Sequence, residues 1–107
     1  GFYLLKDNQL ILGPFQGPIA CTRISKGKGV CGSVWKSKTT IIVDNVNDFE
    51  GHISCNSHSA SELVAPIFDH SNRFIGVLDI DSAKESNFDS MDQEYLEKIT
   101  HIITNLL

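Results

Sequence analysis

Residues 51–62 place one thiol, two imidazoles and one carboxylate within a single short stretch. The apolar residues of this stretch recur at neither helical nor strand spacing, which favours a loop. Loops held by a rigid scaffold often carry functional residues. His52 and His58 lie three residues on either side of Cys55. A nearby positive charge or hydrogen-bond donor favours the reactive thiolate, and these histidines could supply one, so Cys55 is a candidate nucleophile. The alternative is that both histidines are only solvated loop side chains, which is the more common case.

The chain has three cysteines, Cys21, Cys31 and Cys55, and no two of them form a Cys-x-x-Cys pair. An odd count is unusual for a small secreted disulfide scaffold, so reduced thiols in a cytoplasmic protein are the simpler interpretation. A free cysteine can also be only a small buried hydrophobe. That alternative is strongest for Cys31, which lies between Val30 and Gly32.

Two kinds of bound group are not favoured by the sequence. His52-x-x-Cys55-x-x-His58 contains zinc-binding residue types, but a structural zinc site needs four ligands, and the fourth would have to be the distant Cys21 or Cys31. Gly27 and Gly29 lack the third glycine and the preceding buried strand of a nucleotide loop. We therefore expect no metal and no cofactor.

The carboxylates form a second candidate group. Asp79 and Asp81 are two residues apart in an apolar strand, so both should point to the same face, together with Ile75 and Val77. Burying such a pair without partners is costly, which leaves either a solvated strand end or a ligand site. Paired carboxylates can hold an ammonium group, or one can keep its proton and act as an acid. Glu62 could be the third member and a general acid.

The rest of the chain predicts a scaffold for these residues. Six segments have strand character and the last segment has helical spacing, with capping-box spacing between Ser90 and Gln93. The expected strands are Phe2–Leu5, Gln9–Leu12, Ile19–Ile24, Thr39–Val43, Leu63–Phe68 and Arg73–Ile80, with a short helix over Val30–Lys36. Pro66 suggests a bulge or an edge position. We expect one α+β domain over residues 1–107, with an antiparallel sheet of five or six strands and the C-terminal helix on one face.

Composition excludes several classes of partner. The net charge is −4 and most of the nine Lys and Arg residues are dispersed, which argues against nucleic-acid binding. No apolar run approaches the roughly 20 residues that a membrane span needs. We therefore expect neither a nucleic-acid nor a membrane partner.

Several ordered motifs resemble one known family, the free methionine-(R)-sulfoxide reductases, which are a catalytic branch of the GAF domains. The motifs are Leu12-Gly13-Pro14-Phe15-Gln16-Gly17, Ala20-Cys21-Thr22-Arg23-Ile24, Gly27-Lys28-Gly29-Val30-Cys31-Gly32, Asp44-Asn45-Val46, Gly51-His52-Ile53-Ser54-Cys55, Ser61-Glu62-Leu63-Val64-Ala65-Pro66 and Ile75-Gly76-Val77-Leu78-Asp79-Ile80-Asp81-Ser82. Sensory GAF domains generally lack three cysteines at this spacing.

The resemblance implies reduction of free methionine (R)-sulfoxide by thiol chemistry. Cys55 matches the nucleophile and Cys21 the principal resolving cysteine, while Cys31 could be a second resolving thiol or the attacking one. Glu62, Asp79 and Asp81 match the acidic residues of the substrate pocket. A sulfenic acid would form, condense to a disulfide and be reduced by a thioredoxin-type partner. The rival function is a non-catalytic GAF module that binds a small molecule or senses redox state.

The family pattern has a Trp-Ala pair and a helical segment before Gly-Phe-Tyr, and this sequence begins at Gly1 without them. The resemblance therefore implies a GAF-like domain that is truncated at its N-terminus. It also allows for a homodimer, since GAF domains often dimerise through helices.

Overall fold

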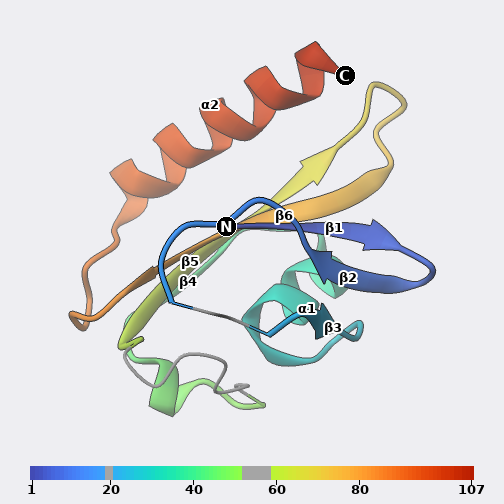
Figure 1. The fold of residues 1–107 in the computed structure, drawn as a ribbon. Coiled ribbons are helices and arrows are strands. Elements are labelled where there is room, and N and C mark those ends of the chain that lie inside the picture. The colour runs from blue at the N-terminus through green and yellow to red at the C-terminus, as the bar shows by residue number, and fades with distance from the viewer. Residues whose placement is uncertain (19–20, 52–58) are drawn as a thin grey trace.

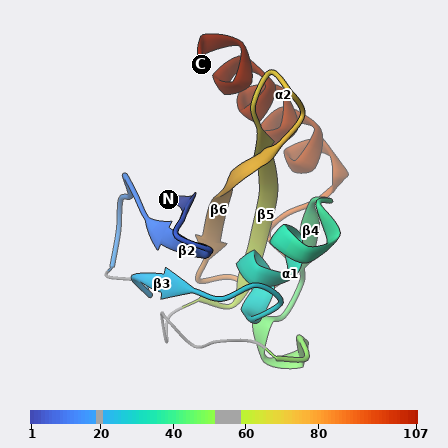
Figure 2. The ribbon, with the colours of Figure 1, turned by 90° about the vertical axis from the view of Figure 1, so that its right-hand side faces the viewer.

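The computed structural model describes residues 1–18, 21–51 and 59–107. The chain forms one six-stranded antiparallel sheet in the order β3-β2-β1-β6-β5-β4, with helix α1 on one face and helix α2 on the other (Figures 1 and 2). The elements are β1 Phe2–Lys6, β2 Gln9–Leu12, β3 Arg23–Ile24, α1 Gly29–Ser37, β4 Ile41–Val43, a 3₁₀ turn η1 Val46–Asp48, β5 Ser61–Phe68, β6 Phe74–Ser82 and α2 Ser90–Leu106. The expected α+β fold is confirmed. Within the described residues, neither helix is long and apolar enough to cross a bilayer.

Strand β5 divides the core between the two helices. Leu63 and Ala65 pack with Leu96 of α2, whereas Val64 packs with Val34 of α1. Successive strand residues point to opposite faces, so one strand can serve both layers. The face of the sheet that carries Val64 is therefore the one that α1 covers.

Two of the expected strands are shorter in the structure. The strand expected over Ile19–Ile24 is only β3, and Cys21 precedes it, while residues 19 and 20 lie outside the described part. The strand expected from Thr39 begins at Ile41, because Lys38 adopts a left-handed conformation that ends α1 and donates its backbone N–H to Val34 O.

Pro66 occupies an inner strand, not an edge. It pairs with Val77 of β6, but β4 extends along β5 only as far as Val64, so the missing Pro66 N–H interrupts no pairing with β4. A register shift follows at Ile67/Phe68. Ile75, near this shift, packs in the α2 layer, so the expectation that it shares a face with Val77 is wrong.

Helix α2 is capped one residue earlier than the sequence suggested. The Asp89 side chain accepts hydrogen bonds from the backbone N–H groups of Met91 and Asp92. The Asp92 carboxylate accepts the Asp89 N–H in return, which completes a capping box. The expected Ser90–Gln93 box is therefore wrong, because Ser90 is already the first helical residue.

Candidate active site

Three acidic residues share the α1 face of the two longest strands. Glu62 pairs with Asp81 across β5 and β6, and Val64 pairs with Asp79. Glu62 and Asp79 are consequently diagonal neighbours on one face of the sheet, within reach of each other. The sequence expectation that Asp79 and Asp81 point the same way fits this register.

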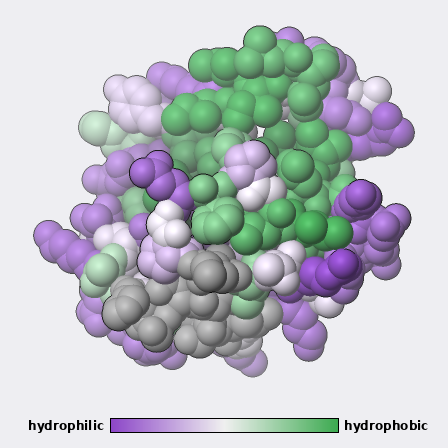
Figure 3. Space-filling view, in the orientation of Figure 1, coloured by the Kyte–Doolittle hydropathy of each residue, from purple (hydrophilic) through white to green (hydrophobic). Residues whose placement is uncertain are grey.

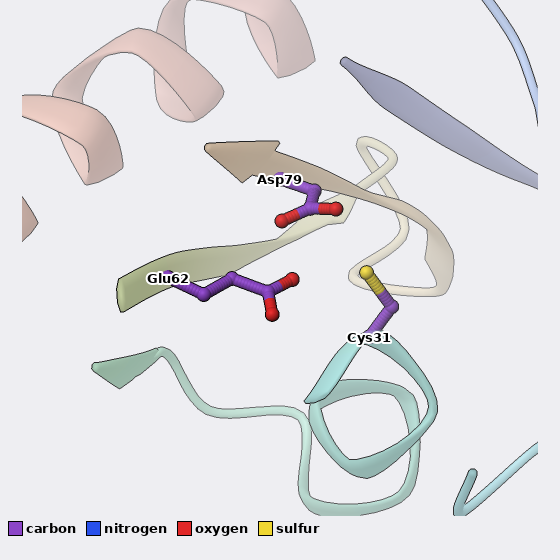
Figure 4. Close-up of side chains that lie close together, drawn as sticks. All are labelled: Cys31, Glu62 and Asp79. Atoms are coloured by element: carbon purple, nitrogen blue, oxygen red, sulfur yellow. The ribbon is translucent and has the colours of Figure 1, made fainter. Parts of the chain in front are cut away.

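Helix α1 adds a thiol to the two carboxyl groups. The sulfur of Cys31 and one oxygen each of Glu62 and Asp79 all lie within 4.8 Å of one another (Figure 4). We call Cys31, Glu62 and Asp79 the buried triad. Its members come from α1, β5 and β6, and their exposed fractions are 4%, 6% and 8%.

Close packing of α1 against the preceding loop sets the position of Cys31. A Cβ atom on Gly32 would lie 2.5 Å from the carbonyl oxygen of Ser25. Glycine therefore lets the helix lie directly against the loop, and Gly27 N–H donates to Gly32 O at 2.8 Å. Cys31 belongs to the buried face of α1 together with Val34.

The buried triad has unusual electrostatics. Burial, followed by the hydrogen bond and the charge of Asp79, raises the pKa of Glu62 to about 11. Burial and then the charges of Asp79 and Glu62 raise the pKa of the Cys31 thiol well above its ordinary value. At neutral pH, Glu62 is therefore a neutral carboxylic acid and Cys31 a neutral thiol. Such a neutral carboxyl can donate a hydrogen bond or a proton to a ligand.

Tyr3 connects the acidic residues to Cys21. It pairs with Val77 next to the site, and its hydroxyl donates a 2.8 Å hydrogen bond to the backbone carbonyl of Cys21. Burial, together with the charge of Cys31, raises the pKa of Tyr3, so the hydroxyl stays a donor. Cys21 is half-buried against the α1-side core and is not a free thiol.

A pocket of about 320 Å³ opens beside the triad. Tyr3 and Asp79 line its inner part, Asp81 lies at the exposed side, and residues 15–18 complete it. Partial desolvation and the charge of Asp79 raise the pKa of Asp81 to about 6. A pocket with two aspartates suits a ligand that carries an ammonium group.

The structure brings together only part of the residue set that the sequence predicted. Cys31, Glu62 and Asp79 converge, Asp81 shares the pocket with Asp79, and Tyr3 links Cys21 to them. Cys55, His52 and His58 lie outside the described residues. Of the two alternatives for the aspartate pair, the solvated strand end fits Asp81, which is exposed. It does not fit Asp79, which is buried. The sequence pointed to no role for Tyr3, because only the β1–β6 pairing places it beside Asp79.

Comparison with known proteins gives the family. The GAF domain model matches residues 1–107, so this chain belongs to the GAF domain family. The chain is 53% identical to GAF domain-containing protein A of Dictyostelium discoideum, over 98% of the chain and 66% of that protein. It is 46% identical to the free methionine-R-sulfoxide reductase of Saccharomyces cerevisiae (96% and 59%) and 44% identical to that of Escherichia coli (100% and 64%). The chain thus spans between 59% and 66% of the length of these relatives.

Solved structures of similar proteins share this fold. The fold matches fRMsr of Staphylococcus aureus in its reduced form with a TM-score of 0.93 and 51% identity, over 98% of this chain and 68% of that one. It also matches free methionine-R-sulfoxide reductase from Neisseria meningitidis in complex with its substrate. The TM-score is 0.95 and the identity 46%, over 98% of this chain and 64% of that one.

Proposed function

We propose that this chain is the catalytic domain of a free methionine-R-sulfoxide reductase. Two relatives of 46% and 44% identity carry that name, as does the Neisseria structure with bound substrate. The observation that carries the proposal is the neutral Glu62 carboxyl, held against Asp79 and beside a pocket for a small cationic group. Sulfoxide reduction needs an acid of this kind, because the oxygen becomes basic as its bond to sulfur breaks.

In the proposed reaction, Asp79 and Asp81 bind the ammonium group of the free amino acid, and Glu62 hydrogen-bonds the sulfoxide oxygen. Cys55 attacks the sulfoxide sulfur as a thiolate. The oxygen passes from the substrate to Cys55, so the sulfoxide is reduced to the thioether methionine and the thiol is oxidised to a sulfenic acid. Cys55 gives up one proton when it forms the thiolate, Glu62 gives one proton to the departing oxygen, and Glu62 then recovers a proton from solvent. Thiol and sulfoxide therefore become sulfenic acid and thioether with no net change in protons.

Cys21 is the proposed resolving cysteine. Its thiol condenses with the Cys55 sulfenic acid, which forms a disulfide and releases one water molecule. Two electrons and two protons from a thioredoxin-type dithiol then restore both thiols. Tyr3 would hold the Cys21 backbone through its hydrogen bond while this exchange takes place.

We assign Cys31 a structural place in the buried triad beside the pocket, and not the attack on the substrate. Its pKa is raised by burial and by the neighbouring carboxylates, whereas a nucleophilic cysteine needs a thiolate. The two alternatives that the sequence left open for Cys31, attack and resolution, are therefore both less favourable than Cys55 and Cys21.

We also propose that the protein works as a homodimer in the reducing environment of the cytoplasm. A stripe of apolar side chains remains exposed along α2, visible as the green band in Figure 3. The exposed members are Met91, Tyr95, Ile99, Ile102 and Leu106. Light scattering of the full-length protein, with Ile102→Glu as the interface variant and Glu94→Gln as the control, tests the dimer: a monomeric wild type would contradict it.

The enzyme assay uses the full-length protein, a thioredoxin system and the separate R and S epimers of free methionine sulfoxide. We expect turnover of the R epimer only. The second candidate, a GAF module that binds without catalysis, predicts that methionine sulfoxide binds but that neither epimer is consumed. Absence of R-epimer turnover would exclude the proposed function.

A further inference from the structure

We propose that the buried triad of Cys31, Glu62 and Asp79 is also a binding site for a thiophilic divalent cation, with Zn²⁺ as the best match, and that this cation inhibits the enzyme. The triad offers one sulfur and two carboxylate oxygens, which are all zinc ligands in proteins. The binding part of the proposal stands on the triad alone. The inhibition part rests on the proposed function.

The geometry suits a single ion. The three ligand atoms come from three different elements and lie within 4.8 Å of one another. The side chains point toward a common centre in Figure 4. Zn–S and Zn–O bonds of about 2.3 and 2.0–2.2 Å put tetrahedral ligands somewhat closer together than this, so small side-chain rotations would close the site.

An independent observation at Asp79 points to a missing partner. Its buried Oδ1 oxygen receives no hydrogen bond from an amide, hydroxyl or cationic group among the residues that the structure describes. The ion pairs found in that part of the chain, Arg73–Asp69 and Lys98–Glu94, do not reach the triad. The hydrogen-bonding neighbours of the Asp79 carboxylate are two other acidic groups, Glu62 and Cys31, and no cationic side chain in the described part of the chain balances its charge. Burying a carboxylate in this way is costly, and a bound cation would remove that cost.

The ligand types select among metals. A thiolate ligand favours Zn²⁺ or Cd²⁺ over Mg²⁺ and Ca²⁺, which prefer all-oxygen sites. Three protein ligands leave a fourth tetrahedral position for water, as in zinc sites that are not closed. The ion would replace the thiol proton of Cys31 and the carboxyl proton of Glu62, releasing both. Glu62 would then have no proton to offer a sulfoxide oxygen, so reduction stops.

The binding experiment isolates Cys31 in the full-length protein. In the Cys21→Ser/Cys55→Ser variant Cys31 is the only thiol of residues 1–107, and Cd²⁺ is added as the probe because the Cd–thiolate bond absorbs in the ultraviolet. We expect one Cd²⁺ per chain, with Zn²⁺ displacing it. A further Cys31→Ser change should abolish the absorption. Changes just outside a ligand shell already cost about 10–100-fold in metal affinity, so Asp79→Asn or Glu62→Gln should weaken binding at least about tenfold.

Glu94→Gln, at an exposed carboxylate of α2, is the matched control and should bind as tightly as its parent. Circular dichroism checks that each variant is folded. Asp79→Asn and Glu62→Gln both keep the side-chain shape nearly unchanged, and either one that folds is enough to test the contribution of the carboxylates to metal binding. No cadmium–thiolate absorption would overturn the site. Unchanged affinity in both carboxylate variants would overturn it as well.

The inhibition experiment compares Zn²⁺ titrations of wild type and Cys31→Ser, each normalised to its own metal-free rate. We expect the Cys31→Ser variant to need at least tenfold more Zn²⁺ for half inhibition. Equal sensitivity would place the inhibitory ion on the other cysteines and overturn the inhibition. A protein that binds one Cd²⁺ through Cys31 but consumes no sulfoxide would instead overturn the proposed function and leave the metal site standing.

Discussion

Glu62 and Asp79 lie diagonally across β5 and β6 and direct their carboxyl groups at one another, and Glu62 is the residue that keeps its proton. The pair is buried beneath α1, with the Cys31 thiol as its third neighbour. Two similar residue types thus have different surroundings because their positions in the sheet differ: Asp79 lines the pocket, and Glu62 lies behind it with its proton retained. The different roles that we propose for them follow from this difference.

Removal of the Glu62 proton should stop the chemistry without unfolding the protein. Glu62→Gln keeps the shape and removes the acid, and general acid catalysis typically contributes about 10²–10⁴-fold. We expect kcat to fall by that order, with Cys55 still open to alkylation. Steady-state assays against Glu94→Gln, which should retain wild-type kcat, check this. A Glu62→Gln enzyme with wild-type kcat would show that Glu62 is not the acid.

The same carboxyl should make stability depend on pH. The folded-state pKa of about 11 exceeds the ordinary value of 4.5, so between these values the native state holds a proton that the unfolded state has released. The free energy of unfolding should therefore fall as pH rises through this window, by up to about 1.4 kcal/mol per pH unit from this group. Urea titrations from about pH 6 to pH 8 measure the slope.

Glu62→Gln is the internal reference for that slope, because it leaves all the histidines in place. The wild type should lose stability relative to this variant as pH rises. Parallel pH profiles for the two proteins would mean that Glu62 is ionised in the fold.

The pairing of β1 with β6 should tolerate no side chain at Gly76. A Cβ atom there would lie 2.3 Å from the carbonyl oxygen of Tyr3. Gly76→Ala must therefore separate the strands, with an expected loss of at least about 2 kcal/mol, at the upper end of overpacking costs. Gly13→Ala is the control, because the nearest atoms that its Cβ would meet, on the Leu4 side chain and the Phe2 carbonyl, lie at ordinary distances of 3.4 Å or more. Equal unfolding midpoints in denaturant would contradict the close approach.

Two neighbouring residues at the N-terminus of α2, Asp89 and Ser90, should contribute very differently to stability. Asp89→Ala removes the side chain that accepts two backbone N–H groups and should cost about 1 kcal/mol. Ser90→Ala should be close to neutral, since Ser90 is the first residue inside the helix. The melting temperatures of the two variants show which substitution costs more stability. A larger loss for Ser90→Ala would place the cap where the sequence pattern first suggested it.

Local sequence patterns predicted the layers of this fold well. The apolar runs of β5 and β6 and the helical spacing of α2 are visible in the residues themselves, because both faces of these strands and one face of the helix must be buried. The cap at Asp89 and the side of the sheet that Ile75 faces could not be predicted. Both depend on a shift of one residue, which the hydrophobic pattern does not resolve.

The candidate site was predictable in residue type but not in arrangement. Spacing placed Asp79 and Asp81 on one face, but it could not show that only Asp79 is buried, since that depends on α1. The apolar neighbours of Cys31 suggested an ordinary core residue, and its carboxylate contacts come from strands at least thirty residues away. Tyr3 had no sequence signal, because its role depends on pairing with a strand at the other end of the domain.

A single-turnover reaction of the Cys21→Ser variant tests the central claim most directly. The full-length variant is mixed with excess free methionine (R)-sulfoxide and no reductant, methionine is counted, and the sulfenic acid is trapped with a dimedone reagent and located by mass spectrometry. We expect about one methionine per chain and a trapped adduct on Cys55. No methionine, or an adduct on Cys31, would contradict the account.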